Sequence, residues 1–160
     1  MNDDDFRERY GAIYEHSPWV AERARPQIDD RDDIDAVAAA MADSVNASSH
    51  DERLALIRQH PELAARVAAP LTSASKDEQA SAGLDRCTPD EFDAFRRLNE
   101  AYRDKFGFPF VIAVRGRSRD EVLAEFRRRM DNDTSVEFDT AIAEIHKIAR
   151  LRLAALKVLT

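Results

Sequence analysis

Signals for the start of a helix recur along this chain, and they constrain its fold more than any other feature. A Ser or Thr with a Glu three residues later has the spacing of a capping box, which satisfies two backbone N–H groups where a helix begins. Such pairs occur at Ser49–Glu52, Ser75–Glu78, Thr88–Glu91, Ser118–Glu121 and Thr134–Glu137. Ser17 before Pro18 is a further start signal, because proline suits the first helical position.

Apolar residues follow these signals with the 3.6-residue period of amphipathic helices, most clearly from Val136 to Leu159. No sustained alternation typical of a strand occurs, and no linker is long enough to separate domains. We therefore predict an all-α fold, with one compact domain over residues 1–160 built from about seven to nine helices.

The stretch Phe106–Val114 is the exception to this helical pattern. It carries no charge, although 34% of the chain is charged. Gly107 and Pro109 interrupt any helix across it. We predict that residues 107–116 form an irregular apolar segment that lines a site, with Arg115 as a cation at its end. A buried connector without a functional role is the alternative interpretation.

The charge balance argues against a nucleic-acid partner, because 31 acidic residues oppose 24 Lys and Arg to give a net charge of -7. No apolar run reaches the roughly 18 residues that a membrane span requires. The acidic N-terminus does not resemble a signal peptide, and the single Cys87 suits a reducing compartment. We expect a cytoplasmic protein.

The basic run 127–129 is predicted to be a solvated helix end, where cations interact favourably with the helix dipole.

The residue pattern does not favour a metal or a cofactor. The four His lack the spacing of a zinc site and have no Cys partner, and the four Gly are too scattered for a phosphate-binding loop. We predict no metal site and no cofactor. Two possibilities then remain for this protein: acid–base catalysis by side chains without a metal or a cofactor, or no catalytic activity.

His60 is the first candidate for such chemistry. It follows the predicted helix 51–59, whose C-terminus favours the cationic form of an imidazole, and Pro61 ends that helix. A fixed imidazole that holds a proton near neutral pH is suited to act as a general acid. A plain helix cap is the alternative role for this histidine.

The second candidate is the run Ser75–Gln79, for which two interpretations are open. Ser75 and Glu78 have the spacing of a capping box and then need no functional explanation. If Glu78 instead faces a pocket, its carboxylate is suited to orient His60, and Gln79 adds a donor and an acceptor beside it.

Several stretches, in order along the chain, together resemble the 2-oxo-4-hydroxy-4-carboxy-5-ureidoimidazoline (OHCU) decarboxylases of urate breakdown. The resemblance covers almost the whole chain. Its specificity comes from the order of the motifs, because His-Pro-x-Leu alone is weak. The matching stretches are Glu-His-Ser-Pro-Trp-Val-Ala at 15–21, His-Pro-Glu-Leu at 60–63, Ser-x-x-Glu-Gln-x-x-x-Gly-Leu at 75–84, Leu-Asn-x-x-Tyr-x-x-Lys-Phe-Gly-Phe-Pro-Phe-Val at 98–111, and Ile-x-x-Ile-Ala-x-x-Arg-Leu at 145–153.

The resemblance implies an all-helical, cofactor-free enzyme, typically a homodimer, that converts the small molecule OHCU into (S)-allantoin and CO2. The family's catalytic histidine and its partner glutamate fall on His60 and Glu78. Arg115 is expected to meet a carboxylate or carbonyl of the substrate. The other substrate-contacting positions fall on Pro61, Ser75, Lys76, Asp77, Gln79, Phe110, Val111, Ile112, Ala113 and Val114.

Two other functions remain open from the sequence. A paralogue with this fold would act on a different ureido or carboxylate ring compound, because the shape of the pocket decides the substrate. A non-catalytic helical interaction module would use residues 106–114 to bind a partner protein. In that case His60 and Glu78 would not share a pocket with residues 106–114.

Overall fold

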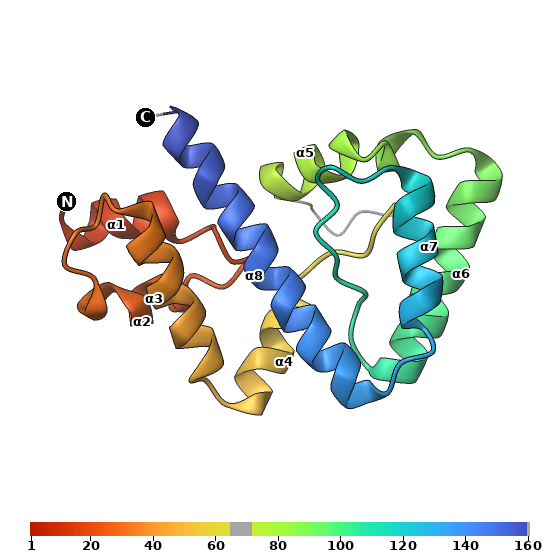
Figure 1. Ribbon diagram of the computed structural model, residues 1–160, viewed down its shortest axis with the longest axis horizontal. Coiled ribbons are helices and arrows are strands. Elements are labelled where there is room, and N and C mark those ends of the chain that lie inside the picture. The colour runs from red at the N-terminus through yellow and green to blue at the C-terminus, as the bar shows by residue number, and fades with distance from the viewer. Residues whose placement is uncertain (65–71, 160) are drawn as a thin grey trace. The chain divides into compact units, whose positions relative to one another are not determined.

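The computed structural model describes residues 1–64 and 72–159, and over these ranges it contains eight α-helices, two short 3-10 helices and no strand (Figure 1). The all-α prediction is confirmed. By its contacts the chain divides into two compact units, Met1–Gln59 with Ile145–Thr160, and His60–Glu144. The assignment of residues 1–160 to one domain stays a prediction.

The first unit is built from short helices and the C-terminal part of the last helix. α2 packs against both α1 and α3 (Figure 1). Its buried side chains are mainly aliphatic, with Phe6, Tyr10 and Tyr14 as aromatic members. The helices are α1 (Asp3–Tyr10), α2 (Trp19–Ala24), the 3-10 helix η1 (Arg25–Gln27), α3 (Ile34–Asn46), α4 (His50–Arg58) and residues 145–159 of α8 (Thr134–Leu159).

Within this unit, a buried ion pair connects a residue near the start of the sequence to a residue near its end. Arg152 of α8 donates to Glu15 at 3.0 Å and to the carbonyl oxygen of Ile13 at 3.2 Å. Glu15 and Arg152 belong to the first and last stretches that carry the family resemblance, and both are buried. These two motifs therefore stabilise the packing of the first unit.

The second unit contains every residue of the predicted site. Its helices are α5 (Ser73–Ser81), the 3-10 helix η2 (Leu84–Arg86), α6 (Pro89–Phe106), α7 (Arg119–Arg129) and the first part of α8. α6 and α7 lie side by side, and an irregular segment connects them (Figure 1).

Aromatic side chains hold this irregular segment in the core of the second unit. Gly107 ends α6 with a φ of 80°, a left-handed conformation that suits glycine. The rings of Phe110 and Phe126 stack with centroids 3.9 Å apart, and the ring of Tyr102 lies 5.3 Å from that of Phe110. The predicted irregular apolar segment is confirmed, and residues 110–114 are all buried.

Three of the predicted capping boxes are confirmed, and they begin α4, α6 and α7 at Ser49, Thr88 and Ser118. The other start signals are wrong in detail. α5 begins earlier than predicted, because the Thr72 side chain caps it and Ser75 lies inside the helix. Pro18 rather than Ser17 stands at the N-cap position of α2, and no side chain caps this helix.

The remaining pair, Thr134–Glu137, does not form a capping box either. Its glutamate is buried and hydrogen-bonds Arg129 instead of the start of its own helix. The prediction of a solvated basic run is therefore also wrong in part. Arg127 and Arg128 are exposed, but Arg129 is only 1% exposed.

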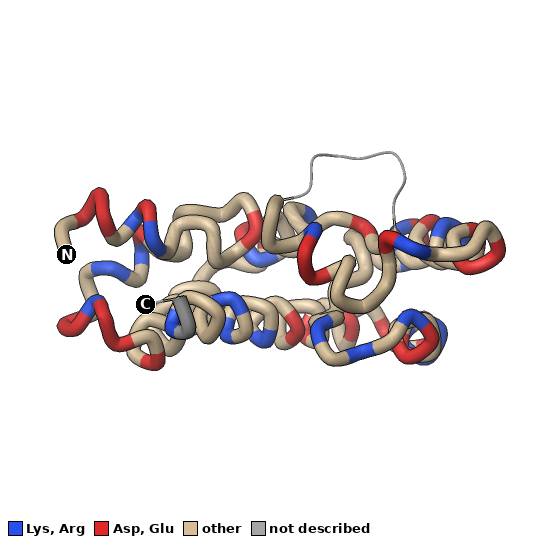
Figure 2. The backbone as a smooth tube through the Cα atoms, turned by 90° about the horizontal axis from the view of Figure 1, so that it is seen from above, with Lys and Arg blue, Asp and Glu red and all other residues tan. Residues whose placement is uncertain are grey.

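Basic and acidic residues are interspersed along the helices rather than separated onto different elements (Figure 2). Within residues 1–64 and 72–159, no helix is long and apolar enough to cross a membrane.

His146 is a half-buried titratable group of the first unit. Its Nδ1 lies 2.8 Å from the Tyr14 hydroxyl, and its Nε2 lies 3.1 Å from Oδ1 of Asn46. A neutral imidazole with its proton on Nε2 satisfies both partners. Burial, together with the positive charge of Arg150, lowers the pKa of His146 below its ordinary value.

This lowered pKa predicts that stability falls as the solution is acidified. Below about pH 6.5 the unfolded chain binds a proton at His146 before the native chain does, so the free energy of unfolding decreases by up to about 1.4 kcal/mol per pH unit. Urea denaturation between pH 7.5 and 5.5 measures this slope, and His146→Gln should reduce it. Equal slopes for the two proteins would contradict the role of His146.

Candidate active site

His60 lies in a short turn just beyond the end of α4. The last helical residue is Arg58 and Gln59 is the C-cap, one residue earlier than in the predicted helix 51–59. His60 is only 7% exposed, whereas Pro61 beside it is half-buried. A buried imidazole at this place is shielded from bulk water, which suits a group that delivers a proton to one defined atom.

Side chains from two helices hold the main chain that follows His60. Gln79 of α5 accepts a hydrogen bond from the Ala64 N–H at 3.1 Å, and its amide donates to the Glu62 carbonyl at 3.5 Å. Asn99 of α6 donates to the Leu63 carbonyl at 3.0 Å. The structure thus brings α5, with its predicted site residues, against the segment that carries His60.

The turn also contains a strained residue. Ala64 has a φ of 55°, in the left-handed region that residues with a Cβ seldom adopt. The buried amide of Gln79 holds the N–H of this residue. We interpret the strain as the consequence of a turn whose shape is set by its contacts rather than by local preference.

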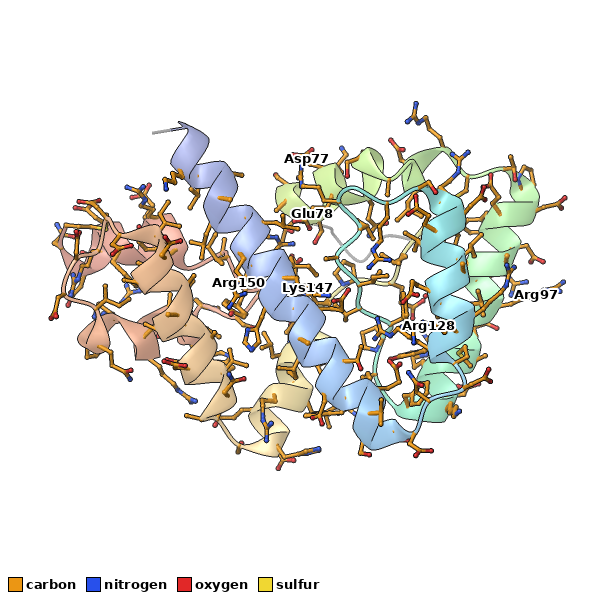
Figure 3. The ribbon with its side chains drawn as sticks, in the orientation of Figure 1. Asp77, Glu78, Arg97, Arg128, Lys147 and Arg150 are labelled. Carbon is orange, nitrogen blue, oxygen red and sulfur yellow. The ribbon has the colours of Figure 1, made fainter. Side chains whose placement is uncertain are left out.

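The predicted site residues of α5 lie on different faces of the helix. Ser75 and Gln79, one turn apart, are buried. Lys76 and Asp77 are exposed, and Glu78 is half-buried. Figure 3 shows the side chains of Asp77 and Glu78 on this helix. Because α5 begins at Ser73, Glu78 lies in its second turn and capping does not account for this carboxylate.

The main chain of the irregular segment is held by two buried side chains. The Val111 carbonyl accepts a hydrogen bond from Arg129 at 2.7 Å, and the Ala113 N–H donates to Glu144 at 3.3 Å. Between these two anchors lies Ile112, whose N–H and C=O have no hydrogen-bond partner within residues 1–64 and 72–159. Arg115, beyond the segment, is exposed.

Sequence reasoning missed a buried polar cluster behind this segment. Arg129 donates to the Glu137 carboxylate at 2.8 to 3.1 Å. The same carboxylate accepts from the Tyr102 hydroxyl at 2.5 Å and from the Asn132 amide at 2.9 Å. Helical periodicity could have revealed Arg129, since it continues the apolar stripe of Val122 and Phe126.

The cluster keeps its glutamate ionised. Burial raises the pKa of the Glu137 carboxyl, but the hydrogen bonds from Arg129, Tyr102 and Asn132 outweigh burial and leave this pKa below its ordinary value. Burial and the hydrogen bond to Glu137 raise the pKa of the Tyr102 hydroxyl, which therefore stays protonated.

A hollow of about 790 Å³ lies beside the C-terminal end of the irregular segment. Its walls come from the end of α5, from η2, from the start of α6 and from residues 116–120. Gly116, at the end of the predicted segment 107–116, lines it, but none of the predicted catalytic or substrate-contacting residues does. In the part of the chain that the structure describes, no three His, Cys, Asp or Glu side chains are grouped so that they could hold a metal ion.

The fold and the site define a helical protein with a buried His-Pro turn, an α-helix bearing Glu-Gln beside it, and an aromatic-anchored irregular segment. The family model for OHCU decarboxylase matches residues 1–154, and the chain therefore belongs to the OHCU decarboxylase family. The resemblance that the sequence motifs indicated is confirmed.

Individual relatives agree with this assignment. The 2-oxo-4-hydroxy-4-carboxy-5-ureidoimidazoline decarboxylase of Haloferax volcanii is 47% identical over 154 residues, which are 96% of this chain and 90% of that protein. A crystal structure of (S)-allantoin synthase has a TM-score of 0.77 at 34% identity, and it matches 97% of this chain but only 50% of the other. A crystal structure of OHCU decarboxylase in the presence of (S)-allantoin has a TM-score of 0.76 over 97% of this chain and 98% of the other; at 22% identity it shows the shared fold alone.

The contacts of Gln79 predict a structural contribution that can be measured without substrate. Gln79→Ala leaves the buried Ala64 N–H without its acceptor, which should lower the free energy of unfolding by about 1 to 3 kcal/mol. Gln79→Glu keeps an acceptor for Ala64 but buries a carboxylate with one oxygen against the Glu62 carbonyl, so it should cost at least as much as Gln79→Ala. Urea denaturation of the two variants and the wild type tests this order. Equal stabilities for all three would contradict it.

Proposed function

We propose that this protein decarboxylates 2-oxo-4-hydroxy-4-carboxy-5-ureidoimidazoline to (S)-allantoin and CO2 in the breakdown of urate, without a cofactor. The observation that carries the proposal is the 47% identity to the Haloferax volcanii decarboxylase along 96% of this chain. The buried His60 turn beside α5 supports it, because the reaction needs a shielded proton donor.

The chemistry of the substrate explains why such an enzyme can work with side chains alone. The carboxylate is attached to a carbon next to a C=N bond, so the electron pair released with CO2 can move into that bond. The substrate thus supplies the electron sink that a cofactor provides in other decarboxylases. The protein has to fix the carboxylate out of the ring plane and deliver one proton to one face.

His60 is the proposed proton donor, and Glu78 is the proposed residue that orients it. His60 is buried, and the hydrogen bonds of Gln79 and Asn99 fix the main chain directly after it. Glu78 precedes Gln79 on α5 and does not begin its helix. A carboxylate near the imidazole would favour the cationic form that donates the proton.

The irregular segment is proposed to bind the amide groups of the substrate through its main chain. Ile112 presents one N–H and one C=O that no other described residue occupies, and its neighbours are held by Arg129 and Glu144. A donor and an acceptor on one residue match the N–H and C=O of a ureido or ring amide. Residues 110–114 are buried, so these hydrogen bonds would form away from water.

The other residues proposed to contact the substrate are partly buried and partly exposed, and the two groups would contact it in different places. Ser75 and Gln79 are buried, so a substrate that reaches them is itself enclosed. Lys76, Asp77 and Arg115 are exposed and are proposed to act at the entrance of the site, where Arg115 would attract the substrate carboxylate.

We also propose that the protein acts as a homodimer in the cytoplasm. Light scattering of the purified chain tests the dimer.

Circular dichroism of the rebuilt pathway tests the proposed reaction. Urate, urate oxidase and hydroxyisourate hydrolase generate the substrate, and the signal of (S)-allantoin is followed with and without this protein. Rapid growth of an optically active product is expected, because spontaneous decay is slow and gives a racemate. A signal no faster than this background would mean a different substrate or a non-catalytic role.

His60→Asn should abolish the enzymatic rate, because asparagine keeps much of the shape of the imidazole but cannot donate a proton in acid catalysis. A loss of about 100-fold or more is expected. The far-ultraviolet spectrum should remain that of the wild type. His50→Asn is the control, since His50 is exposed at the first turn of α4. A His60→Asn protein with most of its activity would remove the assignment of the proton donor.

A further inference from the structure

We propose that Arg129 and Glu137 are positioning residues, which fix the main chain of residues 111–113 and thereby set the affinity for the substrate without contacting it. The inference rests on the proposed function, in which this main chain binds the amide groups of the substrate.

A single side chain, that of Arg129, connects the carboxylate of Glu137 to the main chain of the irregular segment. Nη1 of Arg129 donates to the Val111 carbonyl at 2.7 Å, while Nε and Nη2 donate to Glu137 at 2.8 to 3.1 Å. The guanidinium carbon also lies 4.3 Å from the centre of the Phe110 ring. Arg129 therefore holds both the side chain of residue 110 and the carbonyl of residue 111.

The shape of a guanidinium makes this contact directional. Its donors form a rigid planar fork, so two of its nitrogens on one carboxylate fix the direction in which the third points. Glu137 is fixed in turn by Tyr102 and Asn132. The carbonyl of Val111 can then satisfy Nη1 only in a narrow range of positions.

Stability alone is a weak reason for such a cluster. A buried ion pair often stabilises a protein no more than apolar residues of the same volume would, because both charges lose their hydration. Arg129 and Glu137 are 1% and 0% exposed, so they bear this cost in full. Apolar side chains would fill the space but could not hold a carbonyl at one place.

The second anchor completes the arrangement. Glu144 accepts from the Ala113 N–H at 3.3 Å, so Ile112 is held from the residue before it and from the residue after it. A binding surface made of main chain loses affinity when it must be ordered on binding. Pre-organised anchors on both sides of Ile112 remove that loss.

Arg129→Lys tests the inference, because lysine keeps the charge but cannot hold Glu137 with two nitrogens and Val111 with a third. We expect the KM for OHCU to rise about tenfold or more, with kcat changed much less. The inhibition constant of (S)-allantoin should rise in parallel, since the product keeps the ureido group and ring amide groups and has lost the carboxylate. Arg128→Lys is the matched control.

Arg128 is the preceding residue of α7, and its side chain is 61% exposed and paired with Glu125 (Figure 3). Its lysine variant should leave both constants at the wild-type values. Tyr102→Phe is a milder second variant, which removes one hydroxyl from Glu137 and keeps the ring packing. It should raise both constants about threefold, and it covers the case in which Arg129→Lys does not fold.

The outcomes separate the two proposals. Suppose that the wild type is active and that the folded variants Arg129→Lys and Tyr102→Phe have the same KM and inhibition constant as Arg128→Lys. If only their melting temperatures fall, the cluster merely stabilises the fold and the inference is overturned. If the wild type does not turn over OHCU, the proposed function has failed and the inference fails with it. A rise in both constants for the two cluster variants alone supports positioning.

Discussion

The constraint on which this structure depends is the need to satisfy main-chain N–H and C=O groups in two buried segments that are not helical. A helix satisfies these groups internally, but a buried irregular segment has to find partners elsewhere. Here the partners are side chains from neighbouring helices. Gln79 and Asn99 hold the turn after His60, and Arg129 and Glu144 hold the segment of residues 111–113.

Aromatic packing complements these polar anchors in the irregular segment. Phe110 stacks on Phe126 and lies against Tyr102, so its side chain is fixed within the core of the second unit. The main chain beside it is then held by hydrogen bonds from buried side chains. Together the two kinds of contact give the segment a fixed path without a helix or a sheet. Among residues 1–64 and 72–159 none hydrogen-bonds the main-chain N–H and C=O of Ile112, the groups that are proposed to bind the substrate.

The sequence predicted the helices well, because periodicity and capping act within a few residues. It was wrong at Ser75–Glu78 and Thr134–Glu137, since the same spacing also occurs inside a helix or beside a long-range partner. The burial of Arg129 was missed because a basic run suggests solvent. His60, Glu78 and the irregular segment were candidates from the residue pattern, whereas their roles in the predicted site came from the family resemblance. Their supporting contacts join residues 15 to 36 positions apart, which no local pattern specifies.

α6 is the element that connects the two halves of the proposed chemistry. Asn99 donates to the turn that follows His60, and Tyr102, three residues later, donates to the Glu137 that fixes Arg129. Residues three apart lie on one face of a helix at a fixed separation. The proposed proton donor and the main chain proposed to hold the substrate are thus both positioned by contacts to the same rigid helix. In the proposed mechanism, stereospecific protonation requires such a common support, because the face of the substrate that receives the proton would depend on where His60 lies relative to residues 111–113.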